Sequence, residues 1–222
     1  SLPPMITLHH CLNARSFRPL WMLEEAGVPY ELKMWPFPPR ALDKRYFEVN
    51  PLGTVPTLID GDTRITESAA SCQYIAARHS PGVLDVGVHE PEYGAYLNFL
   101  HQGEATLTFP QTLVLRYAHF EPPERRQPQV ADDYAKWFLA RLKPLGPRMA
   151  EREFICAGRF TAADVSVAYA LQLAETLHLE AQVPPAVLAY WQRLQARPAF
   201  ARAKAAQLAA AQAQGITQRS PI

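Results

Sequence analysis

Two adjacent polar residues, Glu67 and Ser68, stand at the predicted start of a helix that runs to His79. The first turn of a helix presents backbone N–H groups without helical partners, and the helix dipole adds a partial positive charge there. Such an end favours an anionic group. The sequence therefore indicates either a binding site for an anionic ligand or a helix that these two residues merely cap.

The cysteines and histidines predict neither a disulfide framework nor a metal site. Cys11, Cys72 and Cys156 are odd in number and far apart, and they form no C-x-x-C pair, which favours a reducing compartment. His9 and His10 have no cysteine or acidic residue at metal-ligand spacing, so we expect structural roles for them. Cys11 is either a nucleophile or a small apolar residue at the end of a strand, and the second interpretation is favoured.

The first eighty residues alternate between short strands and helices. Apolar, β-branched runs predict strands at 5–9 and 28–34 and a hairpin at 56–66. Helical periodicity predicts helices at 16–26, 41–47 and 67–79, while the three prolines at 35–39 predict a loop. A crossover unit combined with a hairpin implies a small mixed sheet flanked by helices.

The rest of the chain is predicted to be helical. The break at Ser80-Pro81-Gly82 predicts a linker over 81–90, between a domain at 1–80 and an all-helical domain at 91–222. Thr161 and Asp164 precede a long apolar run with the spacing of a capping box, with Asp in place of the usual Glu.

Composition excludes several classes of partner. A formal net charge of +1 over 222 residues gives no reason to expect nucleic acid or an anionic membrane. No apolar run approaches the roughly 20 residues that span a bilayer, and the start of the sequence lacks a signal-peptide pattern. We therefore expect a cytoplasmic protein.

Several motifs resemble those of cytosolic glutathione transferases. The segment from Asn50 to Gly61, followed by Ile65-Thr-Glu-Ser-Ala-Ala, is similar to the glutathione-site core of that family. Three further motifs resemble its first helix and second strand, its capping box and its late helix: Leu23 to Tyr30, Thr161 to Asp164, and Arg197-Pro198. The resemblance covers almost the whole chain. It implies an α/β plus all-α protein, with a thioredoxin-like N-terminal domain followed by an all-helical domain.

The resemblance also implies how glutathione binds. A strand that begins at Val55-Pro56 lacks an N–H at the proline, and in the family this peptide bond is cis. Val55, preceded by Thr54, would then turn its N–H and C=O outward and pair with the tripeptide as an extra strand. Glu67 and Ser68 would hold the γ-glutamyl end, where the hydroxyl and N–H take the carboxylate and the acid takes the ammonium.

The thiol-activating position departs from the family pattern. Several classes place Ser or Cys where this chain has Asn13, and the tyrosine of other classes would lie near His9 and His10. Lowering a thiol pKa by about two units needs roughly 2.7 kcal/mol. One hydrogen bond to a charged group gives about 1.5–3 kcal/mol, so an Asn13 amide N–H helped by the dipole of the first helix is sufficient. Alternatively, Asn13 caps the helix, and Ser16 or a backbone N–H holds the sulfur.

Two further parts of the site follow from the same resemblance. Gly53 stands where several classes place a Lys or His that holds the glycine carboxylate, so Arg40 or Lys44 would have to substitute. The second substrate would lie against the long helix of the C-terminal domain. The residues that would line this apolar pocket, unless they serve plain helix packing, are Thr106, Phe109, Pro110, Leu113 and Tyr117.

The resemblance thus implies a homodimeric detoxification enzyme that adds glutathione thiolate to a small hydrophobic electrophile. Glutathione would be the co-substrate, with no other cofactor and no metal. Two alternatives stay open. One is glutathione-dependent reduction of disulfides or peroxides, or cis–trans isomerisation, on the same fold. The other is a non-catalytic binding module. Lack of a cysteine at position 13 weakens mixed-disulfide chemistry on the protein, but not chemistry that bound glutathione performs by itself.

Overall fold

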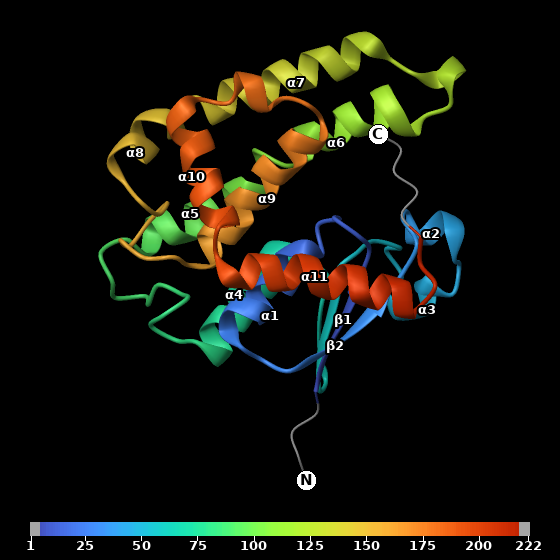
Figure 1. Ribbon diagram of the computed structural model, residues 1–222, viewed down its shortest axis with the longest axis horizontal. Coiled ribbons are helices and arrows are strands. Elements are labelled where there is room, and N and C mark those ends of the chain that lie inside the picture. The colour runs from blue at the N-terminus through green and yellow to red at the C-terminus, as the bar shows by residue number, and fades with distance from the viewer. Residues whose placement is uncertain (1–4, 218–222) are drawn as a thin grey trace. The chain divides into compact units, whose positions relative to one another are not determined.

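The computed structural model describes residues 5–217, which form two compact units. The first unit holds the residues up to Asp85 together with those from Ala196 onward, and the second holds Val86–Gln195. Each unit has its own set of elements (Figure 1). This division differs from the domains predicted from sequence in one respect, because the end of the chain groups with the N-terminal residues.

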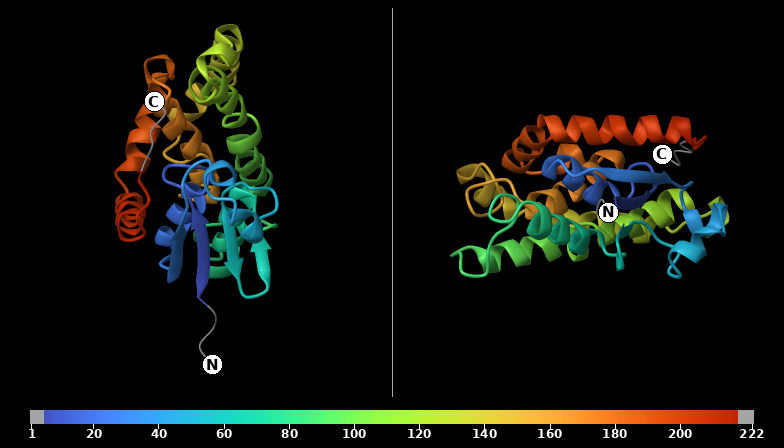
Figure 2. Two further views of the ribbon diagram at one scale, coloured as in Figure 1. Left: turned by 90° about the vertical axis from the view of Figure 1, so that its right-hand side faces the viewer. Right: turned by 90° about the horizontal axis from the view of Figure 1, so that it is seen from below.

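A four-stranded mixed sheet forms the centre of the first unit (Figure 2). In spatial order its strands are β2 (Tyr30–Met34), β1 (Ile6–His10), β3 (Thr57–Asp60) and β4 (Thr63–Ile65). β1 pairs with β2 in parallel and with β3 in antiparallel orientation, so that Leu8 lies between Leu32 and Leu58. A helical crossover joins the parallel strands and a tight turn joins β3 to β4, as these two pairings require.

Within the described residues, five helices belong to this unit. They are α1 (Phe17–Ala26), α2 (Pro39–Leu42), α3 (Tyr46–Val49), α4 (Ser68–His79) and α11 (Pro198–Ala213). α1 packs against both α4 and α11. It ends where Gly27 adopts a φ of 65°, a left-handed conformation that glycine takes without steric cost. The small mixed sheet flanked by helices that the sequence predicts is confirmed.

The segment between β2 and β3 differs from the prediction. The single short helix expected at 41–47 is wrong, because α2 already begins at Pro39 and α3 begins only at Tyr46. Proline suits the first turn of a helix, since its φ is preset and its missing N–H is not needed there. Asp43 interrupts the two helices with an extended backbone, and its carboxylate accepts hydrogen bonds from the backbone and guanidinium of Arg45.

α11 covers one face of α1 and the outer edge of β2. Phe200 packs edge-on against two aromatic residues of α1, with ring centroids 5.6 Å from Phe17 and 5.0 Å from Trp21. Just beyond the helix, the Gln214 side chain makes two hydrogen bonds to the backbone of β2, each 2.8 Å long. These bonds occupy edge groups that would otherwise be open to pairing with another chain.

The regular elements described in the second unit are all helical. They are α5 (Tyr93–Ala105), α6 (Phe109–Leu115), α7 (Pro128–Leu142), α8 (Leu145–Glu151), α9 (Ala162–Thr176) and α10 (Pro185–Gln195), a π-helical turn (Arg116–Phe120) and 3-10 turns (Pro123–Arg125, Glu180–Gln182). The long helix expected here is broken into α5 and α6, because residues 106–108 leave the α-helix and Pro110 restarts it. α5 crosses α9 closely, since a Cβ added at Gly103 would lie 2.4 Å from Ser166 Oγ.

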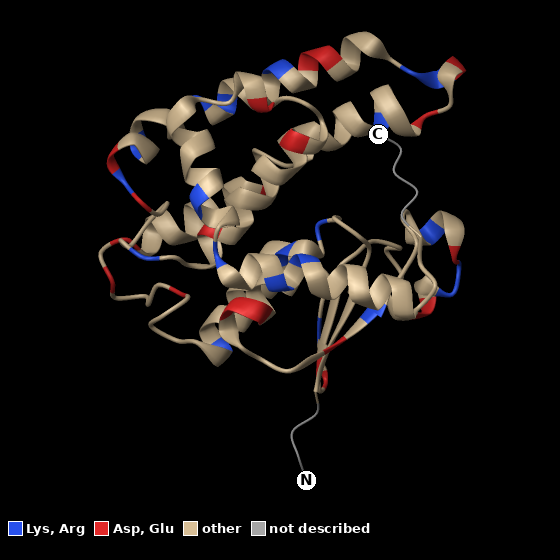
Figure 3. Ribbon diagram, viewed as in Figure 1, with Lys and Arg blue, Asp and Glu red and all other residues tan. Residues whose placement is uncertain are grey.

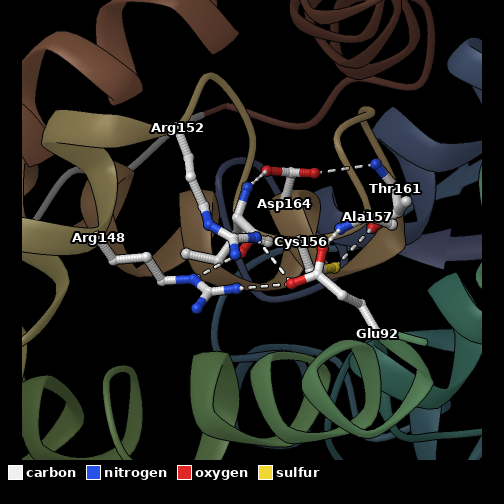
Figure 4. Close-up of polar contacts among 8 residues, drawn as sticks. Glu92, Arg148, Arg152, Cys156, Ala157, Thr161 and Asp164 are labelled. Atoms are coloured by element: carbon white, nitrogen blue, oxygen red, sulfur yellow. Dashed lines mark hydrogen bonds and ion pairs between the residues drawn. The ribbon is translucent and has the colours of Figure 1, made fainter.

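A buried carboxylate fixes the loop that precedes α9 (Figure 4). Thr161 Oγ1 accepts from the Ala163 N–H at 3.3 Å, and the Asp164 carboxylate accepts from the Thr161 N–H at 2.9 Å, so the predicted capping box is confirmed. The second oxygen of Asp164 accepts from the Ile155 N–H at 2.9 Å and from the Tyr190 hydroxyl at 2.6 Å. The cap therefore also anchors α10 and the preceding loop.

Candidate functional site

The loop between β1 and α1 holds the residues expected to contact a thiol. It runs from Cys11 to Ser16, and Asn13 near its centre has a φ of 54°. This left-handed conformation is uncommon for residues other than glycine, and asparagine is one of those that adopt it most readily. Asn13 is half-buried, whereas Ser16 is fully buried. The two candidates therefore differ in their access to a ligand.

A chain of hydrogen bonds joins this loop to α11, which carries its basic residues in its first half (Figure 3). The Lys204 ammonium and the Gln207 amide nitrogen lie 2.9 and 2.8 Å from Asn13 Oδ1. Gln207 Oε1 accepts from the backbone N–H of Asn13 at 3.1 Å and lies 2.8 Å from His10 Nε2. The Nδ1 atom of His10 lies 2.6 Å from Ser16 Oγ.

Donors and acceptors in this chain have one consistent assignment. A lysine ammonium can only donate, so the Asn13 atom beside Lys204 is the amide oxygen. Gln207 then donates with its nitrogen and accepts with its oxygen, which makes His10 Nε2 a donor and His10 Nδ1 an acceptor. The Ser16 hydroxyl therefore gives its single proton to His10, while its oxygen accepts a backbone N–H at 3.3 Å.

Burial keeps His10 neutral, as this assignment requires. Loss of hydration is the main cause that lowers the pKa of His10 from 6.5 to about 4; the hydrogen bond to Gln207 raises it by less, and the charge of Lys204 lowers it further. At neutral pH, Ser16 thus forms an internal bridge within the loop. The Asn13 amide nitrogen, on the side of the amide away from Lys204, carries two N–H groups.

The cysteine of this loop is not suited to nucleophilic chemistry. Cys11 is fully buried, and burial raises the pKa of its thiol to about 12. Its sulfur lies 3.6 Å from the carbonyl oxygen of Pro36. Burial also raises the pKa values of Cys72 and Cys156. Because the thiolate is the reactive form, these environments favour the apolar, structural role that the sequence suggests for Cys11.

Interior hydrogen bonds hold the segment from Thr54 to Pro56. The Thr54 carbonyl accepts from the Tyr46 hydroxyl at 2.7 Å and from the Asn50 amide at 2.9 Å. Val55 is buried in a small cluster that includes Tyr46, and the Val55–Pro56 peptide bond is cis. The Thr54 side chain is exposed. The backbone is therefore fixed from the inside at the place where the tripeptide is expected to pair.

Ser68 begins α4, and a buried arginine stands behind it. Arg18 of α1 is fully buried, and its Nη1 donates to Ser68 Oγ at 3.0 Å. A hydroxyl whose oxygen accepts from arginine has its own proton to donate elsewhere. Glu67 is the N-cap of the helix and is exposed. The helix end, the hydroxyl and the guanidinium together favour an anion here, with an acidic group beside it.

Arg40 lies against Gly53, the position that lacks the side chain found in several classes of the family. A Cβ added at Gly53 would lie 2.8 Å from the Arg40 Cβ and 2.9 Å from the Phe47 ring, and Gly53 has a φ of 68°. Both the space and the backbone conformation therefore favour glycine. Arg40 and Lys44 are exposed, and only Arg40 appears in this contact.

The residues expected to meet the second substrate lie in the second unit. Thr106 follows α5, Phe109 and Leu113 are one turn apart on α6, and Tyr117 is in the π-helical turn. A spacing of four residues places the last three along one side of the helix. Phe109 is 56% exposed, the other three are half-buried, and Pro110 is buried. The unit thus presents a mainly apolar strip along α6.

Two kinds of feature are absent from residues 5–217. No group of three or more His, Cys, Asp or Glu side chains is placed to hold a metal ion. No helix in this range is both long and apolar enough to cross a bilayer. The groups around the β1–α1 loop and the start of α4 are mainly hydrogen-bond donors and cations, with one exposed carboxylate, that of Glu67, beside them.

The sequence does not by itself reveal four of the residues that build this site. Arg18 and Tyr46 have no motif that links them to Ser68 or Thr54. Lys204 and Gln207 lie in an Ala/Gln-rich tail that the sequence assigns to the other domain. One sequence signal points to Lys204 and Gln207. Residues three apart in a helix share a face, and these two are the polar residues on one face of the predicted helix.

Known proteins resemble both units. Residues 14–78 match the family model described as Glutathione S-transferase, N-terminal domain. Glutathione S-transferase 3 of Schizosaccharomyces pombe is 35% identical over 103 residues, which cover 46% of this chain and 43% of that protein. Glutathione S-transferase 4 of Zea mays is 32% identical over 192 residues, which cover 82% of this chain and 83% of that protein.

The fold has close counterparts among solved structures. Ure2p5 from Phanerochaete chrysosporium, cocrystallized with 1-(S-glutathionyl)-2,4-dinitrobenzene, has a TM-score of 0.81 and 22% sequence identity, covering 99% of this chain and 100% of that chain. This likeness supports the expected fold, a thioredoxin-like domain and an all-helical one. Together with the extended match to the maize protein, it shows that the chain belongs to the glutathione S-transferase family.

Proposed function

We propose that the protein is a glutathione transferase that joins the thiolate of glutathione to a small hydrophobic electrophile. The observation that carries this function is the start of α4, where Arg18 holds the Ser68 hydroxyl next to the Glu67 N-cap. A hydroxyl and backbone N–H groups backed by a guanidinium suit the α-carboxylate of the γ-glutamyl residue. Glu67 suits its ammonium group, so both charges of that end have a counterpart.

The middle of the tripeptide would pair with the backbone at Val55. Tyr46 and Asn50 hold the preceding carbonyl from inside the protein, which keeps this segment in one place before the ligand arrives. A ligand that binds a preorganised backbone loses less affinity to ordering. We assign Thr54, Val55 and Pro56 to glutathione binding on this basis.

The thiol would lie beside the Asn13 amide. An amide N–H can donate to a thiolate but cannot accept its proton, so the proton leaves to water. The sulfur electron pair then forms the new C–S bond, and a leaving group, where there is one, departs with its own pair. Ser16 would act only through the loop, because its hydroxyl proton is directed at His10.

The glycine end of glutathione would meet Arg40. This side chain starts directly beside Gly53, where related classes place a basic residue, and it is exposed. A guanidinium binds a carboxylate through two parallel hydrogen bonds, which a flexible lysine does not reproduce. Arg40 is therefore a better candidate than Lys44.

The electrophile would contact the strip along α6. Phe109, Leu113 and Tyr117 offer aromatic and aliphatic surface, and Thr106 offers a hydroxyl at its end. Apolar pockets with few polar groups suit small hydrophobic ligands. The adduct in the related Ure2p5 crystals joins glutathione to a nitroaromatic ring, which supports this substrate class.

The alternatives are less well supported. Disulfide chemistry on the protein itself needs a reactive cysteine, and the three cysteines are buried with raised pKa values. Redox chemistry performed by bound glutathione is not affected by this observation and is the second outcome of the assay below. A non-catalytic module would not need a thiol site. We also propose that the protein is a cytoplasmic homodimer. Light scattering at micromolar concentration would measure its mass.

Calorimetry with two ligands tests the binding site. Ser68→Ala should weaken both glutathione and γ-glutamylcysteine by about 1.5–3 kcal/mol, because both ligands carry the γ-glutamyl carboxylate. Arg40→Ala should weaken glutathione alone, because the dipeptide has no glycine carboxylate. Ser80→Ala makes the same change at the opposite end of α4 and should alter neither affinity. Unchanged binding in the Ser68 variant would remove the glutathione-site assignment.

Turnover with a panel of electrophiles, disulfides and peroxides tests the reaction. Conjugation of an apolar electrophile, with an increased KM for that electrophile in Phe109→Ala and an unchanged KM for glutathione, is expected. Trp137→Ala is the matched control, since Trp137 is another exposed aromatic residue of this unit and lies on α7, not on the strip. Turnover of disulfides or peroxides only would make the enzyme a glutathione-dependent reductase. Glutathione binding without any turnover would make it a binding module.

A further inference from the structure

We propose that α11 is part of the thiol site, and that Lys204 and Gln207 are positioning residues that orient and polarise the Asn13 amide. Both side chains donate to Asn13 Oδ1, at 2.9 and 2.8 Å. They thereby turn the amide nitrogen, the group that would donate to the thiolate, away from α11. Because this role concerns the thiol of bound glutathione, it rests on the function proposed above.

α11 is anchored at both ends, so its side chains can define a position. At its start, the Arg197 guanidinium binds the Glu25 carboxylate of α1 through two bonds of 2.7 and 3.0 Å. Beyond its end, Gln214 accepts from the Met34 N–H and donates to the Leu32 carbonyl, both at 2.8 Å. Between these anchors lie Lys204 and Gln207. The helix therefore acts as a fixed support along the side of the β1–α1 loop.

The ammonium of Lys204 is held in place by more than one contact. It lies 4.5 Å from the centroid of the Phe17 ring and 5.5 Å from that of Phe200, in addition to its bond with Asn13. Aromatic faces attract a cation and shield it partly from water. A charge in such surroundings acts more strongly on nearby groups than one that is fully hydrated.

Gln207 fixes the same loop through two neighbours at once. Its oxygen accepts from the backbone N–H of Asn13 and from His10 Nε2, while its nitrogen donates to the Asn13 side chain. The backbone and the amide of Asn13 are therefore set by one residue, which also explains how the left-handed conformation at this position is maintained. Gln207 is itself almost fully buried, which restricts its own movement.

A cationic donor at one end of an amide strengthens the donor at the other end. The Lys204 bond withdraws electron density from the amide oxygen, which makes the amide N–H groups more positive. The positive charge also favours any anion held by that amide. On the loop itself and on α1 and α11, the other charged groups are cations or carboxylates paired with cations: Arg15, Arg18, Glu24 with Arg202, and Glu25 with Arg197. His10 on β1 is neutral at physiological pH.

Titration of the thiolate absorbance in the enzyme–glutathione complex tests this role. Lys204→Met should raise the pKa of the bound thiol by about one unit, a tenfold loss of thiolate at a pH below that pKa. Lys204→Arg should keep the thiol pKa close to the wild-type value, because arginine is also a cationic donor. Gln207→Glu should raise the thiol pKa as well, since it replaces the donor to Asn13 with a negative charge.

Arg202→Met is the matched control, because it removes one positive charge from the same helix without touching Asn13. It should leave the thiol pKa unchanged. Lys204→Gln keeps a hydrogen-bond donor without the charge, so an effect between wild type and Lys204→Met is expected. Normal glutathione affinity in Lys204→Met with an unaltered thiol pKa would overturn this role alone. Failure of the wild-type protein to bind glutathione would overturn the proposed function instead.

Discussion

Two polar networks hold irregular loops in this molecule, one in each unit. In the second unit, Asp164 accepts hydrogen bonds from two backbone N–H groups and from the Tyr190 hydroxyl. Nearby, Glu92 accepts from the Ala157 N–H at 2.6 Å and forms an ion pair with Arg152 at 2.7 Å (Figure 4). Ala157 has a φ of 59°, and this network supports that left-handed residue.

In the first unit, the corresponding left-handed residue is Asn13, with a φ of 54°. Its loop is held by Gln207, His10 and Ser16, which are neutral, and by one cation, Lys204. Both networks thus stabilise a loop that contains a left-handed residue, but they use different groups. Carboxylates are strong acceptors and serve the second unit well. Near a thiolate, however, a carboxylate would disfavour the anion, whereas an amide and an imidazole do not.

The two networks also differ in whether they reach the protein surface. The oxygens of Asp164 accept from three buried groups, the Ile155 and Thr161 N–H and the Tyr190 hydroxyl, and Asp164 is itself fully buried. The first network leads from buried His10 outward to half-buried Asn13. We infer that the second network serves stability and the first serves presentation of a polar group. Three measurements test this distinction, in order of decreasing effect.

Removal of the central carboxylate should have the largest effect, and only on stability. Asp164→Ala leaves three buried donors without an acceptor, which should lower the free energy of unfolding by about 3–5 kcal/mol in urea titrations. Thr161→Ala removes the cap acceptor and a weak contact with Cys156 Sγ, and it should cost about 0.5–2 kcal/mol. The pKa of bound glutathione should be unchanged in both. A shifted thiol pKa in folded Asp164→Ala would show that the two networks are not separate in purpose.

Acid should act mainly on the first network, because it contains a buried histidine that must stay uncharged. The folded-state pKa of His10 is about 4 and the ordinary value is 6.5, so the unfolded chain binds more protons between these values. Stability is therefore full above the unfolded value and falls as the pH drops towards the folded one, by up to about 3 kcal/mol. His9, whose pKa burial also lowers to about 4, contributes in the same direction.

Urea unfolding at a series of pH values measures this slope. His10→Gln keeps a polar side chain but removes the titrating group, so its stability should fall less between pH 6.5 and about 4.5 than that of the wild type. His101→Gln is a control, because His101 lies on α5 in the second unit and is exposed. Equal slopes in wild type and His10→Gln would mean that His10 takes up a proton in the folded protein as readily as in the unfolded chain, which contradicts the assigned hydrogen bonds.

Much of this architecture is predictable from local patterns. The strands, α1, α4 and the capping box follow from apolar periodicity, turn residues and cap spacing, each of which acts over a few neighbours. The split of one expected helix into α2 and α3 was missed because Asp43 and Pro39 act through single-residue backbone preferences. The break after α5 is not evident from the apolar pattern, which continues across residues 106–108 where the structure leaves the α-helix.

The site is less predictable, for a physical reason. Glu67, Ser68 and Val55 lie in motifs that are contiguous in sequence. Arg18 and Gln207 act through contacts across 50 and 197 positions, with Ser68 and His10, and no local pattern encodes such a pairing. Residue types and the family resemblance identify the loop that is expected to face the thiol. They do not reveal that the Ser16 hydroxyl is bonded to His10 inside the protein.

The last measurement separates the donors of that loop. Asn13→Ala should raise the pKa of bound glutathione by about one to two units, equivalent to about 1.4–2.7 kcal/mol. Ser16→Ala should lower stability, because it leaves His10 Nδ1 and a backbone N–H without their partner, yet should shift the thiol pKa less than Asn13→Ala does. Cys11→Ala should leave the thiol pKa unchanged, because a buried thiol with a raised pKa carries no charge at neutral pH.

Titrating the thiolate absorbance in all three variants distinguishes the roles of Asn13, Ser16 and Cys11. A thiolate that survives Asn13→Ala but is lost in Ser16→Ala would place the sulfur at Ser16 and require the Ser16–His10 bond to open on binding. A thiolate lost only in Cys11→Ala would move the chemistry to the protein's own sulfur, and the first network would then serve stability, as the second does.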